Sequence, residues 1–242
     1  MIYPQFILEG TKKKFFALLI DPENYTEKAL STTIKIANQN KTDLILLGGS
    51  LVSETLDRPI EFIKALTNIP VFLFPGSLLQ LSGKADGILL LSLISGRNPE
   101  FLIGNHVLAA PMIKKYGLET IPTGYILIGN SNTGVEYMSN TSPIPSNKKD
   151  LAVATAMAGE MLGHKLIYLE GGSGAKQPIP KETIRKVKMN ISIPLVIGGG
   201  IRTGKDAHMA YKAGADIIVV GNAIEKDPEL ITEITYQKSK FN

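Results

Sequence analysis

Cysteine and tryptophan are both missing from the 242 residues of this chain. Without cysteine, disulfide bonds and thiolate chemistry are excluded. Histidine is scarce as well, since only His106, His164 and His208 occur, and none has a metal-site spacing such as His-Glu-x-x-His. We interpret all three as structural or surface residues. No Ser/His/Asp arrangement stands out near a predicted strand end, which argues against hydrolase chemistry of that kind.

Long apolar runs and a strong charge of either sign are also lacking. No uninterrupted apolar stretch reaches the roughly 18 residues that cross a bilayer, and the run from Phe15 to Ile20 ends at Asp21-Pro22, too early for a signal peptide. The 26 Lys and Arg residues exceed the 22 Asp and Glu residues by only four, so the net charge is +4. We therefore expect a cytoplasmic protein with no nucleic-acid partner and at most transient contact with a membrane surface.

Eight short runs rich in Ile, Val and Leu recur along the chain. They cover residues 15–20, 44–47, 71–74, 88–91, 125–128, 166–169, 195–197 and 217–220. The runs are continuous rather than alternating, which is typical of strands that are buried on both faces of a parallel sheet.

Segments with helical periodicity separate these runs. Leu30, Ile34 and Ala37 mark one buried face, and Ile231 with Ile234 marks another near the end of the chain. A further helix near 151–162 is expected to bury one apolar face, made of Leu151, Ala154, Ala158, Met161 and Leu162. Three helix starts are signalled by Asn98-Pro99, by Asp227-Pro228 and by a capping box of Thr203 with Asp206.

Eight strands that alternate with helices predict one α/β domain over residues 1–242, a (β/α)₈ TIM barrel, with an open doubly wound sheet as the main alternative. Two intervals break the regular spacing. Residues 75–86 leave little room for a helix with two loops, so the third helix is expected to be curtailed or replaced. Residues 129–150 form a long polar interval that predicts a mobile loop at the strand-end face and a candidate lid.

In a parallel barrel the active site lies where strands end, so the residues after each run are the informative ones. The seventh run is followed by Gly198-Gly199-Gly200 and the eighth by Gly221-Asn222. Glycine lets the backbone approach an anion, and a following helix N-terminus adds partial positive charge. This position matches the recurrent phosphate site of the fold. The alternative is that these glycines only make tight turns.

The sixth run continues into Glu170, Gly171, Gly172, Ser173 and Gly174. Tyr168 and Glu170 are two residues apart on a strand, so both side chains point to the same face. If that face is the barrel mouth, Glu170 can accept a proton from a substrate hydroxyl and Tyr168 can hydrogen-bond the substrate. Ser173 can donate to a phosphate. The alternatives are a salt-bridged rim position for Glu170 and an ordinary turn for Ser173.

Asp21 follows the first run and Ser50 follows the second. Pro22 prevents further strand pairing and holds the Asp21 carboxylate in the mouth. An oxygen-only pair of this kind suits Mg²⁺, which keeps water molecules and takes its remaining ligands from substrate phosphates. Asp-Pro is also a common turn.

Several motifs, taken together and in order, resemble a known family. They are Leu19-Ile20-Asp21-Pro22, Leu47-Gly48-Gly49-Ser50, the stretch Tyr168 to Gly174, Gly198 to Arg202, and Val220-Gly221-Asn222. Between about residue 14 and residue 228 they are similar to the geranylgeranylglyceryl phosphate synthase family, including its bacterial heptaprenylglyceryl relatives. The Tyr-Leu-Glu-x-Gly-Ser-Gly stretch is the most specific element. The glycine pairs alone would also fit barrels of histidine or tryptophan biosynthesis.

The resemblance implies a modified barrel and a transferase of phospholipid biosynthesis. Members of this family use Mg²⁺ to transfer a prenyl group, here geranylgeranyl, from a prenyl diphosphate to the C3 hydroxyl of sn-glycerol 1-phosphate. By resemblance, Asp21 and Ser50 bind the metal, and Glu170 is the catalytic residue. The glycerol moiety is assigned to Tyr168, Glu170, Gly171, Gly172, Ser173 and Gly174. Its phosphate is assigned to Gly199, Gly200, Gly221 and Asn222.

Three alternatives stay open at this point. The donor can be a C15, C20 or C35 prenyl diphosphate, with 79–81, 109–113 and Tyr125 as expected walls of its groove. A sugar-phosphate isomerase or lyase barrel would instead use Asp21 and Glu170 as an acid and base pair. A barrel that only binds a phosphorylated metabolite is the third reading. We also expect a homo-oligomer, a dimer or a hexamer.

Overall fold

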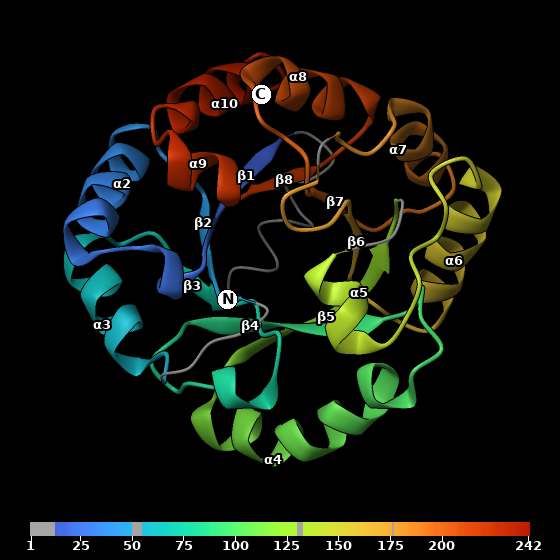
Figure 1. Ribbon diagram of the computed structural model, residues 1–242, viewed down its shortest axis with the longest axis horizontal. Helices are drawn as coiled ribbons and strands as arrows, with labels where there is room; N and C mark the ends of the chain where they lie inside the picture. Colours follow the sequence, from blue (N-terminus) through green and yellow to red (C-terminus); the bar gives the residue numbers. More distant parts are fainter. Residues whose placement is uncertain (1–12, 50–54, 130–132, 176) are drawn as a thin grey trace.

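The computed structural model describes residues 13–49, 55–129, 133–175 and 177–242. Eight parallel strands form a closed barrel in the order of the sequence (Figure 1). The strands are β1 (Phe15–Ile20), β2 (Leu44–Leu47), β3 (Val71–Leu73), β4 (Gly87–Leu93), β5 (Glu119–Leu127), β6 (Leu166–Glu170), β7 (Leu195–Gly198) and β8 (Ile217–Val220). Because β8 pairs with β1, the barrel prediction is confirmed and the open sheet is excluded.

Seven helices surround the barrel as an outer ring among the described residues (Figure 1). They are α2 (Glu27–Gln39), α3 (Asp57–Leu66), α4 (Asn105–Tyr116), α6 (Lys149–Met161), α7 (Lys181–Lys188), α8 (Gly204–Ala213) and α10 (Leu230–Ser239). The short helices α5 (Gly134–Ser139) and α9 (Asn222–Lys226) lie inside this ring. A 3₁₀ turn, η1 (Pro22–Asn24), follows β1, and a π-helical turn, η3 (Glu100–Gly104), leads into α4.

Most of the predicted local signals are confirmed. Leu30, Ile34 and Ala37 are buried in α2, and Ile231 and Ile234 are buried in α10. The Thr203 and Asp206 side chains form the capping box at the start of α8. The side chains of Asn98 and Asp227 each accept a hydrogen bond from the backbone two residues on, but the helical segments begin later than predicted, at Glu100 and Leu230, and neither has a side-chain cap. Strand β5 begins earlier than its apolar run, because polar residues, proline and glycine occupy its first half.

The prediction for the buried face of α6 is wrong. Leu151, Ala154, Ala158, Met161 and Leu162 are all exposed. The helix instead buries Ala152, Ala156 and Gly159. A side chain at Gly159 would meet the tips of Ile94 and Ile167, so the small residues let α6 approach the barrel closely and turn the larger ones outward.

Two hydrophobic clusters form the core, one inside the barrel and one between the strands and the helices. The inner cluster includes Phe72, Tyr125 and Tyr168, and the outer one includes Ile45, Ile126 and Leu169. Neighbouring residues of a strand thus face opposite layers, as a two-residue period requires. The same alternation directs Tyr168 and Glu170 toward the inside of the barrel.

The helix expected between β3 and β4 is replaced by a 3₁₀ turn, η2 (Leu78–Gln80), as the short interval predicted. The side chain of Gln80 is buried beneath this turn. Its Oε1 accepts hydrogen bonds from the amides of Gly49 and Gly76, and its Nε2 donates to the Gly49 carbonyl at 2.6 Å. Gln80 therefore joins the loops that follow β2 and β3.

Asp216 directly precedes β8, at the amino-terminal end of the barrel strands. It joins neighbouring parts of the barrel through ion pairs. Its carboxylate pairs with Lys14 at 3.1 Å and Lys188 at 2.6 Å, and also accepts from the Leu195 amide at 2.9 Å. Only 3% of the Asp216 side chain is exposed, so these partners take the place of water.

We expect Asp216→Ala to lower the free energy of unfolding by about 2–4 kcal/mol, because it leaves two cations and one amide without their partner. Urea denaturation followed by circular dichroism measures the change. Glu61→Ala is the control, since it removes an ion pair with Lys84 in which both side chains are more than half exposed. An Asp216→Ala chain as stable as the Glu61→Ala chain would contradict the assignment.

Candidate active site

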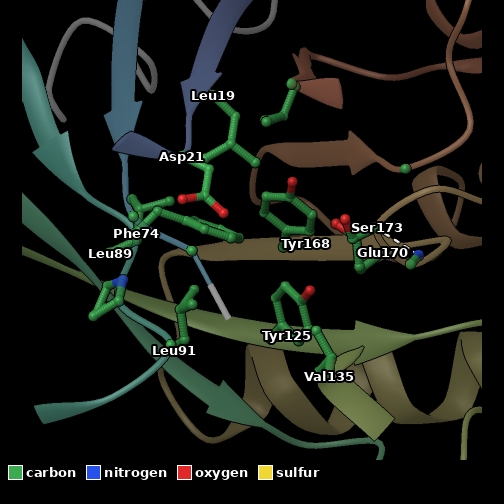
Figure 2. A pocket seen from close by; sticks show the side chains of 18 of the residues that line it. Leu19, Asp21, Phe74, Leu89, Leu91, Tyr125, Val135, Tyr168, Glu170 and Ser173 are labelled. Carbon is green, nitrogen blue, oxygen red and sulfur yellow. Dashed lines mark hydrogen bonds between the residues drawn. The ribbon is translucent and has the colours of Figure 1, made fainter. Parts of the chain in front are cut away.

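A cavity of about 490 Å³ opens at the carboxyl ends of the strands (Figure 2). Each of the eight strands contributes a lining residue, either from its end or from the loop that follows. The position agrees with the rule that active sites of such barrels lie on this face. One part of the lining is rich in glycine and polar groups, and the other is apolar and aromatic.

Glu170 ends β6 and points into the cavity, although only 6% of the residue is exposed. Its Oε1 accepts a hydrogen bond of 2.6 Å from the Gly172 amide. Burial raises the pKa of the Glu170 carboxyl to about 7, against the opposing effect of the Gly172 amide and of the nearby Tyr168 and Tyr125 phenols. A carboxyl with this pKa is partly ionised at neutral pH and can take up and release a proton there.

Tyr168 lies on the same face as Glu170, as the spacing predicted. It is fully buried, and its hydroxyl makes no hydrogen bond to any described residue. Burial raises the pKa of the Tyr168 phenol well above its usual value, and the charge of Glu170 adds to the effect. Tyr168 therefore stays protonated at neutral pH.

Gly199, the first residue after β7, packs directly against Glu170. Its φ of +79° lies in the left-handed region, and a β-carbon there would overlap Glu170 Oε1 and the amides of Gly171 and Gly172. Only glycine meets both conditions at once. The close approach of this loop is part of what removes water from the Glu170 carboxylate.

The loops after β6, β7 and β8 meet beside Glu170 and form the polar part of the lining. The amides of Ser173, Gly174, Gly199 and Gly200 donate to no protein acceptor within the described part of the chain. Ser173 Oγ donates to Asn222 Oδ1 at 2.9 Å, which links the first loop to the third. Backbone amides that converge in this way bind anions.

Arg202 holds the far end of the β6 loop. Its Nη2 donates to the carbonyls of Gly174 and Ala175, at 3.2 and 2.8 Å. The residue also lines the cavity, so it adds a positive charge next to the free amides. Arg202 was noted only as part of a motif, because the sequence does not show that its side chain folds back over the preceding loop.

The structure brings most of the predicted site residues together around this one cavity. The lining includes Asp21, Tyr168, Glu170, Gly172, Ser173, Gly174, Gly199, Gly200, Gly221 and Asn222. Gly171 does not reach the lining, because its amide donates to the Gly198 carbonyl at 2.9 Å and extends the sheet. Ser50 lies outside the described residues. The chemical roles of these residues stay predictions.

Asp21 stands on the β1 side of the cavity, with Tyr168 between it and Glu170 (Figure 2). Burial raises the pKa of the Asp21 carboxyl, and the negative charges of Glu225 and Glu23 raise it further, while the Glu23 amide acts in the opposite sense. A poorly solvated carboxylate beside other acids gains from a cation. Among the described residues no three or more His, Cys, Asp or Glu side chains cluster as a metal site. Mg²⁺ binds through one or two carboxylates when substrate phosphates complete its shell, so Asp21 suits it.

The apolar part of the cavity extends across β4. Leu89 and Leu91 from the inner face and Ile88 and Leu90 from the outer face all contribute. This is possible because no full helix covers the barrel between β3 and β4. Of the expected groove walls, Leu81, Ala109 and Tyr125 line the cavity. Leu79, which is 80% exposed, Gln80 and residues 110–113 do not.

The interval 129–150, predicted as a loop and candidate lid, contains helix α5. Thr133 and Glu136 form its capping box, and a bridge between Ile128 and Ile144 returns the chain to the barrel. Val135 and Met138 of α5 line the cavity, so the segment covers part of the mouth. The mobility of the segment stays a prediction.

Phe74 was read from the sequence as part of a buried run. The residue follows β3, lines the cavity and packs against two tyrosines, with ring centroids 5.5 Å from Tyr168 and 6.2 Å from Tyr125. The two tyrosine rings are 5.1 Å apart. Tyr125, expected only as a groove wall, therefore also stands beside the predicted catalytic carboxylate. No sequence signal separates a core aromatic at a strand end from one that lines a site.

These features define a class, the (β/α)₈ barrels whose last three loops meet at one side of a cavity at the carboxyl ends of the strands. The model of the PcrB family matches residues 9–238, and the chain belongs to this family. It is 52% identical over 236 residues to the geranylgeranylglyceryl phosphate synthase of Chitinophaga pinensis, with 96% of this chain and 94% of the relative covered. The protein of that name from Pyrococcus horikoshii is 43% identical over 221 residues, with 90% of this chain and 87% of the relative covered.

A solved structure matches over the whole length as well. The crystal structure of (S)-3-O-geranylgeranylglyceryl phosphate synthase from Thermoplasma acidophilum, in complex with sn-glycerol-1-phosphate, has a TM-score of 0.94. Its sequence is 31% identical, and 99% of each chain is covered. The family resemblance drawn from the motifs is thereby confirmed.

Burial of Glu170 also predicts how stability depends on pH. Because the folded pKa of about 7 exceeds the ordinary value of 4.5, ionisation opposes folding. The penalty is absent below pH 4.5, grows as pH rises to 7, and then stays constant. We expect Glu170→Gln to remove it, so that the variant gains about 3 kcal/mol relative to the natural chain between pH 4 and pH 8. Urea denaturation of both chains at the two pH values measures this gain, and an equal difference at both would contradict it.

Proposed function

We propose that this protein is a prenyltransferase that makes an ether-lipid precursor. It transfers a geranylgeranyl group from geranylgeranyl diphosphate to the C3 hydroxyl of sn-glycerol 1-phosphate. The observation that carries the proposal is the position of Glu170, a buried carboxyl with a pKa of about 7 between an anion-binding corner and an apolar cavity. The names of the relatives and the sn-glycerol-1-phosphate bound to the Thermoplasma acidophilum neighbour support the same reaction.

The acceptor fits the polar corner. The phosphate receives hydrogen bonds from the free amides of the β6 and β7 loops, and Arg202 supplies a positive charge nearby. A glycerol phosphate anchored there extends its carbon chain toward Glu170. The Tyr168 hydroxyl, which has no partner among the described residues, is placed to donate to the glycerol.

The donor fits the opposite side. Asp21, together with the predicted ligand Ser50, would hold Mg²⁺, and the ion would supply positive charge to neutralise the diphosphate leaving group. The prenyl tail occupies the apolar part of the cavity and passes over β4 between η2 and α4. Leu78, Leu81 and Ala109 supply walls there.

Glu170 acts as the general base. It removes the proton of the C3 hydroxyl as the oxygen attacks the allylic carbon of the donor. The Gly172 amide orients the carboxylate, since it holds Oε1 at 2.6 Å and leaves Oε2 for the substrate. No covalent intermediate on the protein is needed, in keeping with the lack of an evident nucleophile.

A sugar-phosphate isomerase using Asp21 and Glu170 as acid and base is less well supported. The aromatic side chains of Phe74, beside Asp21, and Tyr168, between Asp21 and Glu170, line this part of the cavity (Figure 2). A sugar phosphate carries several hydroxyl groups that need polar partners, whereas a prenyl chain is matched by such walls. The aromatic walls also argue against a barrel that only binds a phosphorylated metabolite, because such a ligand has no apolar part to contact them.

The assay that tests the function uses purified protein, Mg²⁺ and radiolabelled geranylgeranyl diphosphate, with sn-glycerol 1-phosphate in one tube and sn-glycerol 3-phosphate in another. We expect a product that extracts into organic solvent only with the 1-phosphate. A series of C15, C20 and C35 donors then sets the preferred chain length. No product with any donor would overturn the proposal.

The exchange Glu170→Gln removes the base but keeps the shape of the side chain. We expect turnover to fall by about 10²- to 10⁴-fold. In the natural enzyme, kcat/KM should rise about tenfold per pH unit below pH 7 and level off above it, and this dependence should vanish in the variant. Initial rates from pH 5.5 to 8.5 check both points. Near-normal activity of the variant would remove Glu170 from the mechanism.

The exchange Asp21→Ala tests the metal site. We expect a sharp rise in the Mg²⁺ concentration needed for half-maximal activity, because the protein then loses the carboxylate that fixes the ion. Activity measured against Mg²⁺ concentration gives this value. An unchanged titration would place the ion elsewhere.

The proposal also covers where the enzyme works and how it assembles. No helix among the described residues is long and apolar enough to cross a membrane. We place the enzyme in the cytoplasm, with transient contact to a membrane surface when its lipid product leaves. A homo-oligomer is the expected assembly.

A further inference from the structure

Three aromatic rings occupy the part of the cavity that separates the donor and acceptor sides. Phe74, Tyr125 and Tyr168 are in mutual contact, with ring centroids between 5.1 and 6.2 Å apart. Tyr125 and Tyr168 are paired in register on the neighbouring strands β5 and β6, and Phe74 follows β3 and reaches them across the inside of the barrel. Figure 2 shows the Tyr168 ring between the carboxylates of Asp21 and Glu170, with the Phe74 ring beside Asp21.

Phe74 differs from the two tyrosines in how much of its ring is available. Tyr168 is fully enclosed and Tyr125 is 5% exposed, whereas Phe74 is only partly buried. Phe74 also carries no hydroxyl, so hydrogen bonding to the substrate does not explain its place. What it offers to a bound molecule is an aromatic face.

The position of this ring is fixed by the barrel. The Phe74 amide donates to the Leu47 carbonyl at 2.9 Å, which continues the pairing of β3 with β2. The Phe74 side chain packs against the inner cluster, and the neighbouring Gly76 amide is held by Gln80. The aromatic face is therefore in place before any ligand binds, which electrostatic stabilisation of a transition state requires.

We propose that Phe74 is a catalytic residue. The face of its ring stabilises the positive charge that develops on the allylic carbons of the prenyl donor while the diphosphate departs. The inference rests on the proposed function, because it requires an allylic diphosphate whose reacting carbon lies between Asp21 and Glu170.

The charge arises from the bond changes of the transfer. The bond between C1 of the donor and the diphosphate oxygen breaks, and both electrons leave with the diphosphate. The positive charge is shared between C1 and C3 of the allylic system. A lone pair of the glycerol oxygen then forms the new bond to C1, and its proton moves to Glu170. No oxidant or reductant is needed.

The surroundings of Phe74 suit this role. The aromatic face carries partial negative charge and attracts a cation, and the attraction grows where water is kept out. Leu19, Leu89 and Leu91 also line this cavity, and their side chains carry no lone pair that could capture the cation. The ring thus stabilises the charge without competing with the glycerol oxygen for the carbon.

The experiment replaces Phe74 by mono-, tri- and pentafluorinated phenylalanine. Fluorine withdraws the negative charge from the face of the ring and changes its size little. We expect the single-turnover rate constant to fall stepwise, by about tenfold or more at the end of the series. The KM for the donor should change by no more than about twofold, because the neutral tail is bound as before.

Phe72 is the matched control. It lies two residues earlier on β3 in the inner cluster, it is fully buried, and it does not line the cavity. The same series at Phe72 should leave the rate constant unchanged. A fall at Phe72 equal to that at Phe74 would overturn the inference, because it would show that fluorination acts through packing.

A binding measurement separates charge from packing without turnover. We expect an ammonium analogue of the allylic cation, bound together with Mg²⁺ and inorganic pyrophosphate, to bind more weakly along the Phe74 series. Geranylgeraniol, which has the tail but no charge, should bind equally to every variant. Flat rates and flat binding would overturn the inference while leaving the transferase activity intact. A natural chain that turns over no prenyl donor would overturn the proposed function and this inference together.

Discussion

The burial of one carboxylate at the end of β6 is the constraint on which the site depends. Glu170 has little access to water, and its Oε1 is held by the Gly172 amide at 2.6 Å. The arrangement needs the Gly199 loop to pass close by, which only a residue without a β-carbon allows. The same tightly folded loops leave the amides of Ser173, Gly174, Gly199 and Gly200 without protein acceptors among the described residues. Burial by the close loop raises the pKa of the carboxyl, and the free amides are the groups proposed to bind the phosphate.

The aromatic and apolar half of the cavity follows from a second constraint, the closure of the barrel. Residues of the inner layer come from every strand, and at the carboxyl ends these include Phe74, Tyr125 and Tyr168. Farther from the mouth the same layer is a filled core. The cavity is therefore an extension of the core that is left open at one end.

The sequence predicts most of this architecture because a barrel repeats one simple pattern eight times. Continuous apolar runs predicted the strands correctly, and the glycines after β7 and β8 line the cavity as expected, while their binding of a phosphate stays a prediction. The face of α6 was misjudged because periodicity does not tell a large exposed side chain from a buried one, and here Gly159 and its small neighbours take the contact. The places of Phe74 and Arg202 depend on which distant residues the closed barrel brings together, and no local pattern contains that information.

A 3₁₀ turn stands between β3 and β4 where the other strands are covered by a helix, so the outer layer of the barrel is thinner at this point. Seven helices of the described chain cover the strands, but at this one point the outer face of β4 is reached by the cavity through Ile88 and Leu90. The loops that face Glu170 lie across the barrel and share none of these residues. The gap between β3 and β4 and the loops beside Glu170 are thus built from different residues of the barrel. The space for a lipid tail can therefore change in length during evolution while the residues on the opposite side of the cavity stay the same.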